Sequence, residues 1–146
     1  MAEVLVLETS ACLDLLIGTR EGQIVRQALL GHPVHVSDHV GVEVAMALRE
    51  LTRQQLLPTS ELDLRIRLLA TAPFTTHSSG SLLPAAVSKS GLRLGDALCV
   101  ALSELLAAPL VTTDARLGTV WPRCWLIAVP VAEFRASSQF DSSTPG

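Results

Sequence analysis

The chain has 146 residues, a formal net charge of −3, and 49% apolar against 17% charged residues. This length is that of one domain, and this composition excludes an intrinsically disordered chain. The negative net charge excludes a protein that holds nucleic acid mainly through a general basic field. Because aromatic residues make up only 3% of the chain, a base-stacking RNA-binding module is not expected either.

Hydropathy and cysteine content indicate the compartment and the need for a partner. The mean hydropathy of +0.42 predicts that some apolar surface is hidden in a homodimer or a tight complex. No basic residue precedes Arg20, and Glu8 and Asp14 interrupt the N-terminal apolar run, so neither a signal peptide nor a membrane span is expected. Three cysteines without metal-type spacing are typical of free thiols, with Cys12 and Cys99 buried, which favours the cytoplasm.

The first half of the chain alternates short apolar runs with helical patterns. Residues 4–7 form a continuous apolar run that is typical of a buried strand. The helix that follows is expected to begin with Ser10 as its N-cap and to end at Gly18. Further along, we expect a helix over 21–30, a strand over 33–37, a helix over 40–55 with Asp38 as N-cap, and a helix beginning near Ser60.

The second half continues the alternation. We expect a strand over 73–77, a short helix ending at Lys89, a helix over 95–107, a strand over 110–112, a helical turn opened by Asp114, and a strand over 125–129. The core face of the helix over 95–107 is predicted to contain Leu98, Ala101, Leu102 and Leu105. Strands alternating with helices predict one α/β domain with a mostly parallel sheet covered on both faces. We place this domain at residues 1–135 and a flexible tail at 136–146.

Four acidic residues stand out by their positions. Glu8 and Asp114 each follow a predicted strand, and ligands of open α/β sheets bind at the carboxyl ends of the strands. Glu43 and Asp96 lie on predicted helices beside apolar neighbours. Each acid also has a structural explanation: a helix cap for Asp114, the helix dipole for Asp96, the core edge for Glu43 and solvent for Glu8.

Taken together, the four acids indicate a metal site. Two carboxylates about 4 Å apart repel each other by roughly 4 kcal/mol at an effective dielectric constant of 20. A converging set therefore needs a cation, and Mg²⁺ or Mn²⁺ prefers such oxygen ligands. An ion of this kind suits the hydrolysis of a phosphodiester bond.

The acidic segments resemble a known family. LGDALCVALSE at 94–104 and LVTTDARL at 110–117 look like the C-terminal half of PIN-domain ribonucleases of the VapC toxin type. VEVAMALR at 42–49 resembles the second acidic motif of that family, and VLETSA at 6–11 resembles its opening strand and loop. The resemblance runs from residue 4 to about residue 129 with all segments in the expected order.

The resemblance implies a fold, an activity and partners. It implies a PIN-like three-layer α/β/α domain and a Mg²⁺-dependent endoribonuclease with Mn²⁺ as a substitute, which a cognate antitoxin inhibits and which is commonly a homodimer. Position 8 departs from the family, which usually has Asp there. Matched by motif, the catalytic set is Glu43, Asp96, Asp114, Ser10 and Thr112, and the metal-binding set is Glu8, Glu43, Asp96 and Asp114.

Two other functions remain open at this point. One is a catalytically weak PIN-like protein that acts by binding RNA or a partner, and metal-dependent RNA cleavage separates it from the nuclease. The other is a phosphatase or receiver-like domain, which the absence of an acid pair around Glu8 and of a matching lysine after a late strand disfavours.

Other candidate residues are given structural roles. The histidines at 32, 35 and 39 span a strand and a turn, so they are not expected to share one face or one metal ion. Arg49, Arg93 and Arg116 lie near the acidic motifs, where they can contact RNA phosphates or occupy solvated helix faces, the commoner case. Trp121 and Trp125 are expected to be packing residues.

Overall fold

A single parallel sheet forms the centre of the protein. The computed structural model describes residues 2–127, and its strands have the spatial order β3-β2-β1-β4-β5 with every neighbouring pair parallel. All three residues of β1 are buried, as expected for a central strand covered on both faces. The strands are β1 (Leu5–Leu7), β2 (Val34–Ser37), β3 (Thr75–His77), β4 (Leu110–Thr112) and β5 (Cys124–Leu126).

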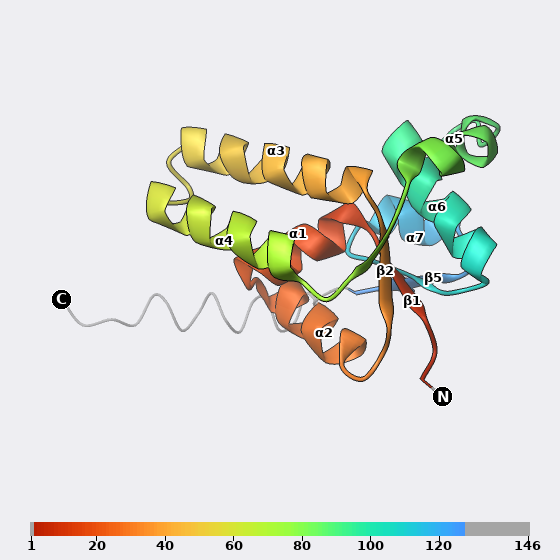
Figure 1. Cartoon of the computed structure of the whole chain (residues 1–146), viewed down its shortest axis with the longest axis horizontal. Helices are drawn as coiled ribbons and strands as arrows, with labels where there is room; N and C mark the ends of the chain where they lie inside the picture. Colours follow the sequence, from red (N-terminus) through yellow and green to blue (C-terminus); the bar gives the residue numbers. More distant parts are fainter. Residues whose placement is uncertain (1, 128–146) are drawn as a thin grey trace.

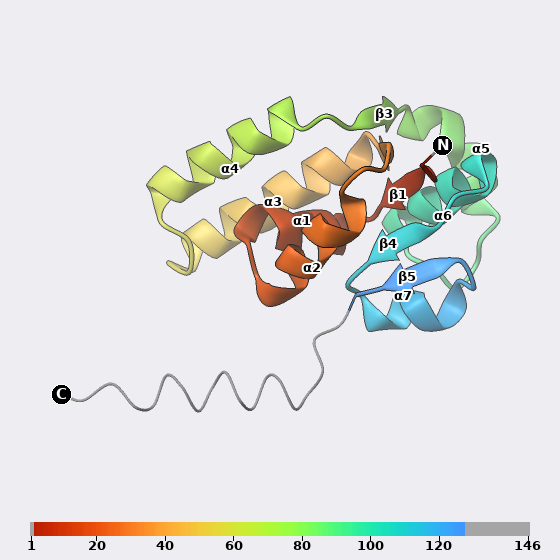
Figure 2. The same cartoon turned by 90° about the horizontal axis from the view of Figure 1, so that it is seen from below.

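Helices cover both faces of this sheet. Figure 1 shows α1 to α4 on one side of the strands and α5 to α7 on the other, and Figure 2 shows the same division from below. On one side α1 packs against α2 and α3, and on the other α6 lies on β1, β2 and β4. The predicted three-layer α/β/α fold is therefore confirmed. The helices are α1 (Thr9–Ile17), α2 (Arg20–Leu29), α3 (His39–Arg53), α4 (Thr59–Thr71), α5 (Ser79–Val87), α6 (Leu94–Leu106) and α7 (Ala115–Val120).

The strand order reverses between β1 and β4. The chain proceeds outward from β1 to β2 and β3, crosses back by α5 and α6 to β4, and then proceeds outward to β5. In open α/β sheets this reversal opens a crevice beyond the carboxyl ends of the two central strands. Glu8 follows β1 directly, and Asp114 follows β4 after one residue. The topology thus brings these two acids to the same crevice.

Local details differ from the sequence-based expectations in three places. Glu8, and not Ser10, is the N-cap of α1. Asp38 precedes α3 as expected but makes no capping hydrogen bond there, because its Oδ1 accepts one from the backbone N–H of Ser79 at 3.0 Å. Leu105 was predicted to lie in the core, and this is wrong, since it is 67% exposed.

The remaining elements match the expected order. The last strand is Cys124–Leu126, slightly earlier than expected, while residues 128 and 129 and the expected tail lie outside the described residues. Cys12 and Cys99 are buried free thiols, as the sequence suggested. Within residues 2–127, no helix has the length and apolar character that crossing a membrane requires.

Candidate active site

Glu8 is a buried carboxylate held by three hydrogen bonds. It is only 4% exposed. Its Oε1 accepts the backbone N–H of Ser10 at 2.9 Å, and its Oε2 accepts the hydroxyl groups of Ser10 and Thr112, the latter at 2.7 Å. A carboxylate offers about four acceptor positions, so three are used inside the protein. Glu8 is therefore fixed in place and keeps one acceptor position for a ligand.

The hydroxyl groups of Ser10 and Thr112 connect the ends of β1 and β4. The Thr112 hydroxyl donates to Glu8 and also accepts the backbone N–H of Asp114 at 3.0 Å. The Ser10 hydroxyl lies 3.3 Å from the backbone N–H of Thr113, which donates to it. Both predicted hydroxyl residues thus lie between Glu8 and the loop that carries Asp114.

Asp114 has the capping role that the sequence allowed for it. Its Oδ1 accepts the backbone N–H of Arg116 at 2.9 Å, and its Oδ2 lies 3.4 Å from the Arg116 guanidinium. The Asp114 side chain is 23% exposed, and that of Arg116 is 67% exposed. Because an N-cap uses one carboxylate oxygen, capping leaves Asp114 able to bind a ligand through the other oxygen.

Asp96 lies among the other three acids. It is in the first turn of α6, where burial is the main cause that raises the pKa of its carboxyl group. The negative charges of Glu8, Asp114 and Glu43 raise this pKa further, and the nearby Arg93 guanidinium lowers it. All four predicted acids are therefore electrostatically coupled, and we call them the acidic cluster.

Glu43 reaches the cluster from α3 between a histidine and a glycine. Its Oε1 lies 3.0 Å from His39 Nε2, one helical turn earlier. A Cβ atom built on Gly95 of α6 would approach the same oxygen to 2.6 Å. Despite these close neighbours, Glu43 Oε1 is a buried oxygen with no hydrogen bond within the described part of the chain. The Glu43 side chain as a whole is 44% exposed, so its carboxylate is open to a cation from the solvent side.

The acidic cluster fits a hydrated divalent cation. Its donors are all carboxylate oxygens, which Mg²⁺ and Mn²⁺ prefer. Across residues 2–127, no three His, Cys, Asp or Glu side chains are placed to hold an ion directly between them. Mg²⁺ usually keeps several water molecules and takes only one or two carboxylates directly. An ion bound at these acids would therefore be held partly through water.

The histidines near this region contact different partners. His32 Nδ1 lies 2.8 Å from the carbonyl oxygen of Glu3, and His35 Nδ1 lies 2.7 Å from His77 Nε2. The third, His39, contacts Ser37 Oγ through its Nδ1 at 2.7 Å. The histidines at 32, 35 and 39 therefore each have a different neighbour in this structure.

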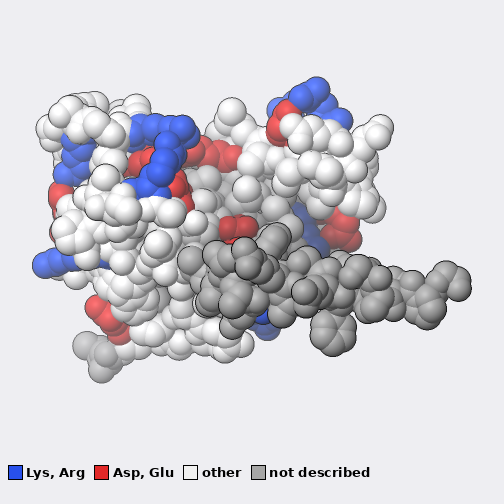
Figure 3. Space-filling model, turned by 180° about the vertical axis from the view of Figure 1, so that it is seen from behind, with Lys and Arg blue, Asp and Glu red and all other residues white. Residues whose placement is uncertain are grey.

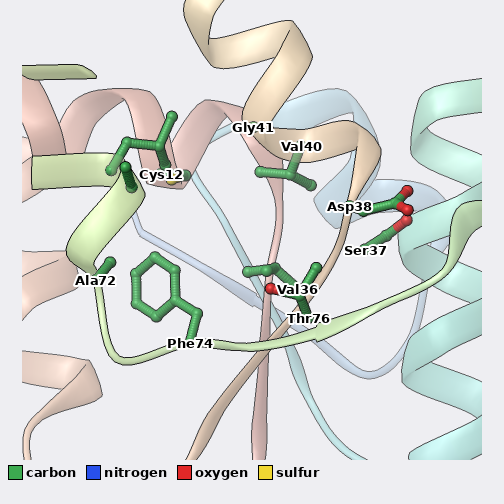
Figure 4. A pocket seen from close by; sticks show the side chains of 11 residues that line it. Cys12, Val36, Ser37, Asp38, Val40, Gly41, Ala72, Phe74 and Thr76 are labelled. Atoms are coloured by element: carbon green, nitrogen blue, oxygen red, sulfur yellow. The ribbon is translucent and has the colours of Figure 1, made fainter. Parts of the chain in front are cut away.

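A separate cavity of about 340 Å³ lies where β2, β3 and the start of α3 meet. Figure 4 shows the Phe74 ring beside the apolar side chains that line it, with Asp38 at one end. None of the four acids lines this cavity. The candidate active site is therefore the acidic cluster and not the cavity.

Sequence reasoning missed two polar contacts around the cluster. One is His39, whose position four residues before Glu43 on a helix is itself the signal that could have found it. The other is Asp14, which accepts the hydroxyl hydrogens of Thr113 at 2.7 Å and Thr19 at 3.0 Å. Asp14 fixes the loop after β4 against α1, and its only signal was an acid inside an apolar helix.

Comparisons with known proteins agree with this architecture. Residues 5–120 match the family model of the PIN domain. The chain is 38% identical over 122 residues to "Ribonuclease VapC3" of Mycobacterium tuberculosis, covering 82% of this chain and 89% of the relative. It is 34% identical over 123 residues to "Ribonuclease VapC12" of the same organism, covering 79% of this chain and 90% of the relative.

Solved structures share the fold at lower sequence identity. A toxin–antitoxin complex from Klebsiella pneumoniae matches with a TM-score of 0.60 and 21% identity, covering 86% of this chain and 99% of that chain. VapC20 of Mycobacterium tuberculosis, described as a sarcin-ricin loop cleaving toxin, matches with a TM-score of 0.60 and 13% identity over the same shares. The match over residues 5–120 and the two relatives above 30% identity show that the chain belongs to the PIN-domain family, and within it to the VapC type.

Proposed function

We propose that this protein is a divalent-metal-dependent endoribonuclease and the toxin of a toxin–antitoxin pair. The observation that carries the proposal is the position of Asp96, a partly buried carboxylate among three others: burial raises its pKa most, and the charges of Glu8, Asp114 and Glu43 raise it further. Such a set of acids is costly without a cation and useful with one. The names of the relatives, both ribonucleases, support RNA as the substrate.

Three acids of the cluster are proposed as the main metal-binding groups. Glu43, Asp96 and Asp114 would hold Mg²⁺, or Mn²⁺ in its place, and Glu8 would contribute directly or through water. The bound cation supplies a positive charge for the phosphodiester and lowers the pKa of the attacking water.

The neighbouring side chains would keep these acids in position. Ser10 and Thr112 hold the Glu8 carboxylate by hydrogen bonds, so its orientation is fixed before substrate arrives. The close approach of His39 and Gly95 limits the directions that the Glu43 carboxylate can take. Preorganisation of this kind matters because small displacements of catalytic groups reduce rates steeply.

The proposal includes a cognate antitoxin and a homodimer in the cytoplasm. Large apolar side chains lie on the surface of the described residues, among them Val42 and Met46 of α3 at 62% and 64% exposure. Exposed apolar groups of this size favour a protein partner. The similar structure from Klebsiella pneumoniae is a toxin–antitoxin complex, which supports an antitoxin as one such partner. Co-expression with the product of an adjacent short reading frame tests this: a stable complex that suppresses cleavage is expected, and a lack of binding would contradict it.

Cleavage of RNA by the purified chain tests the central proposal. We expect cleavage with Mg²⁺ or Mn²⁺, no cleavage with EDTA, and no cleavage by Asp96→Asn with either metal. Asp63→Asn is the matched control, because Asp63 is 68% exposed on α4 and pairs with Arg67. RNA that is bound but never cut would overturn the nuclease and favour a binding protein.

A further inference from the structure

A narrow groove opens beside the acidic cluster. Its volume is about 160 Å³, and Arg93, Asp96 and Arg116 supply its charged side chains. Leu92, Leu117 and Val120 form its apolar wall. At roughly 30 Å³ per water molecule, this volume is large enough for one phosphate group. Figure 3 shows basic side chains directly beside acidic ones on the half of the molecule that α5 to α7 form, at the left in that view.

The two arginines of the groove are available for a ligand. Between residues 2 and 127 the Arg93 guanidinium has no hydrogen bond or close ion pair, although its charge acts on the nearby Asp96. Among residues 2–127, the guanidinium of Arg116 has only the long 3.4 Å contact with Asp114, and its side chain is 67% exposed. Exposed pairs of this kind contribute little stability. By contrast, Arg53, Arg65 and Arg67 are paired with acids of their own helices at 2.5–3.0 Å.

A second cavity continues this groove. It has a volume of about 320 Å³, shares Gly91, Leu92 and Val120 with the groove, and extends to Lys89 and Trp121. The Trp121 indole packs against the core and donates its Nε1–H to Ser103 Oγ at 3.3 Å. Its ring is therefore held in one orientation, and an aromatic face held in this way is a good surface for a nucleobase.

We infer that the groove and the second cavity together form the RNA-binding track that leads to the acidic cluster. This inference rests on the proposed function. Arg93 and Arg116 bind one backbone phosphate next to the phosphate at the acidic cluster, and the cavity beside Trp121 receives an adjoining base. Arginine suits this role because its planar guanidinium binds phosphate through two parallel hydrogen bonds.

Electrostatics explains why such a track is needed. The chain carries a net charge of −3, and the acidic cluster itself repels a polyanion. A phosphate close to four carboxylates therefore needs positive charge from the protein itself, with or without a bound cation. Arg93, the N-cap of α6 three residues before Asp96, and Arg116, in the first turn of α7 two residues after Asp114, supply this charge.

Salt-dependent RNA binding tests the inference without cleavage. The affinity of the full chain for a short fluorescent single-stranded RNA is measured by anisotropy in EDTA at increasing salt. We expect Arg93→Gln and Arg116→Gln each to weaken binding about tenfold at low salt and to reduce the slope of log K against log salt by about 0.7. Arg26→Gln makes the same charge change on α2, in the other helical layer. It should change both the RNA affinity and the salt slope much less.

Arg93→Lys separates charge from geometry. Because lysine keeps the charge and loses the paired hydrogen bonds, we expect a salt slope like that of the unmodified chain with a lower affinity. Binding by Arg93→Gln and Arg116→Gln that equals that of Arg26→Gln overturns the track, and so does an unmodified chain that shows no RNA binding at low salt.

Indole fluorescence tests the base-binding half of the track. The chain has two tryptophans, so the variant Trp125→Phe reports on Trp121 alone. We expect RNA to quench its fluorescence with the same concentration dependence as the anisotropy. An unchanged signal during binding overturns the base site. These outcomes are independent of the nuclease proposal. If the chain cuts RNA but Arg93→Gln and Arg116→Gln bind RNA as well as the unmodified chain does, only the track is refuted. If binding depends on the arginines but RNA is not cut, only the nuclease is refuted.

Discussion

The acidic cluster has two halves that differ in how well their carboxylates are satisfied. At the strand ends, Glu8 is 4% exposed and accepts three hydrogen bonds from Ser10 and Thr112. On the helices, the Glu43 carboxylate has only the 3.0 Å contact with His39 Nε2 among the described residues and its side chain is 44% exposed, while the pKa of Asp96 is raised by burial and by its acidic neighbours. The carboxylate at the strand ends is therefore compensated inside the protein, whereas those on the helices are compensated less.

This difference separates a framework from a ligand-binding surface. A carboxylate whose hydrogen bonds are made inside the protein stabilises the native state, because its charge is compensated. A carboxylate that is desolvated and surrounded by like charge destabilises the native state until a cation arrives. In the proposed site Glu8 would thus belong mainly to the framework and Glu43 and Asp96 mainly to the binding surface, while Asp114, which caps α7, would serve both.

The largest expected effect comes from removing charge on the binding side. Asp96→Asn should lower RNA cleavage by at least about 100-fold, since even residues that only support a metal ligand cost 10–100-fold when changed. Its thermal stability in EDTA should be equal to or higher than that of the unmodified chain, because one repelling charge is gone. A folded Asp96→Asn protein with full activity would contradict the division into two halves.

Metal binding should relieve the repulsion on the helix side. At a hundredfold excess over Kd, a ligand that binds only the native state adds about 2.7 kcal/mol to the free energy of unfolding. We therefore expect a higher melting temperature in Mg²⁺ or Mn²⁺ than in EDTA, and no such increase for Asp96→Asn. The exposed control Asp63→Asn should behave like the unmodified chain. Identical melting curves with and without metal would speak against the site.

Glu8 tests the framework side. Glu8→Gln places an amide where Ser10 and Thr112 now donate hydrogen bonds, so we expect a loss of about 1 kcal/mol in the free energy of unfolding and a fall in cleavage of roughly 10–100-fold. Glu8→Asp keeps a good N-cap for α1 but is one methylene shorter, so it should lose less activity than Glu8→Gln. If Glu8→Gln has the stability, metal affinity and cleavage rate of the unmodified chain, Glu8 is not part of the site.

The sequence predicted the fold class well because the alternation of strands and helices indicates a parallel α/β sheet. Short apolar runs at 4–7 and 110–112 had only one interpretation in an α/β chain, and acids directly after such runs had to lie at the carboxyl edge. The error at Leu105 has a local cause. Near its end, α6 buries Ser103, whose hydroxyl donates to the carbonyl oxygen of Ala108 at 2.5 Å, and this orientation leaves Leu105 exposed.

The details of the site could not be read from spacing along the chain. The capping role of Glu8 depends on α1 beginning directly after β1, which no residue preference indicates because serine is the commoner N-cap. The contact of Gly95 with Glu43 joins α6 to α3 and depends on how closely two helices from opposite layers approach. Periodicity predicts which face of a helix is buried, but not which atoms then meet.

The smallest expected effect concerns the contact between Gly95 and Glu43. It is also the most specific test of the difference between the two halves of the acidic cluster. In Gly95→Ala the new Cβ would lie 2.6 Å from Glu43 Oε1, so the carboxylate must rotate away. Because Glu43 is long and flexible at its end, folding should be little affected, while cleavage and metal affinity should fall by up to about tenfold.

Gly41→Ala is the matched control for this change. Gly41 lies inside α3, and a Cβ there meets no other atom within 4 Å. Alanine is favoured over glycine in a helix by about 1 kcal/mol, so Gly41→Ala should raise the melting temperature and leave cleavage unchanged. If both variants lose activity equally, the effect comes from the helices in general and not from Glu43. If only Gly95→Ala loses activity, and it binds Mn²⁺ more weakly with an unchanged melting temperature in EDTA, the effect arises at the Glu43 carboxylate.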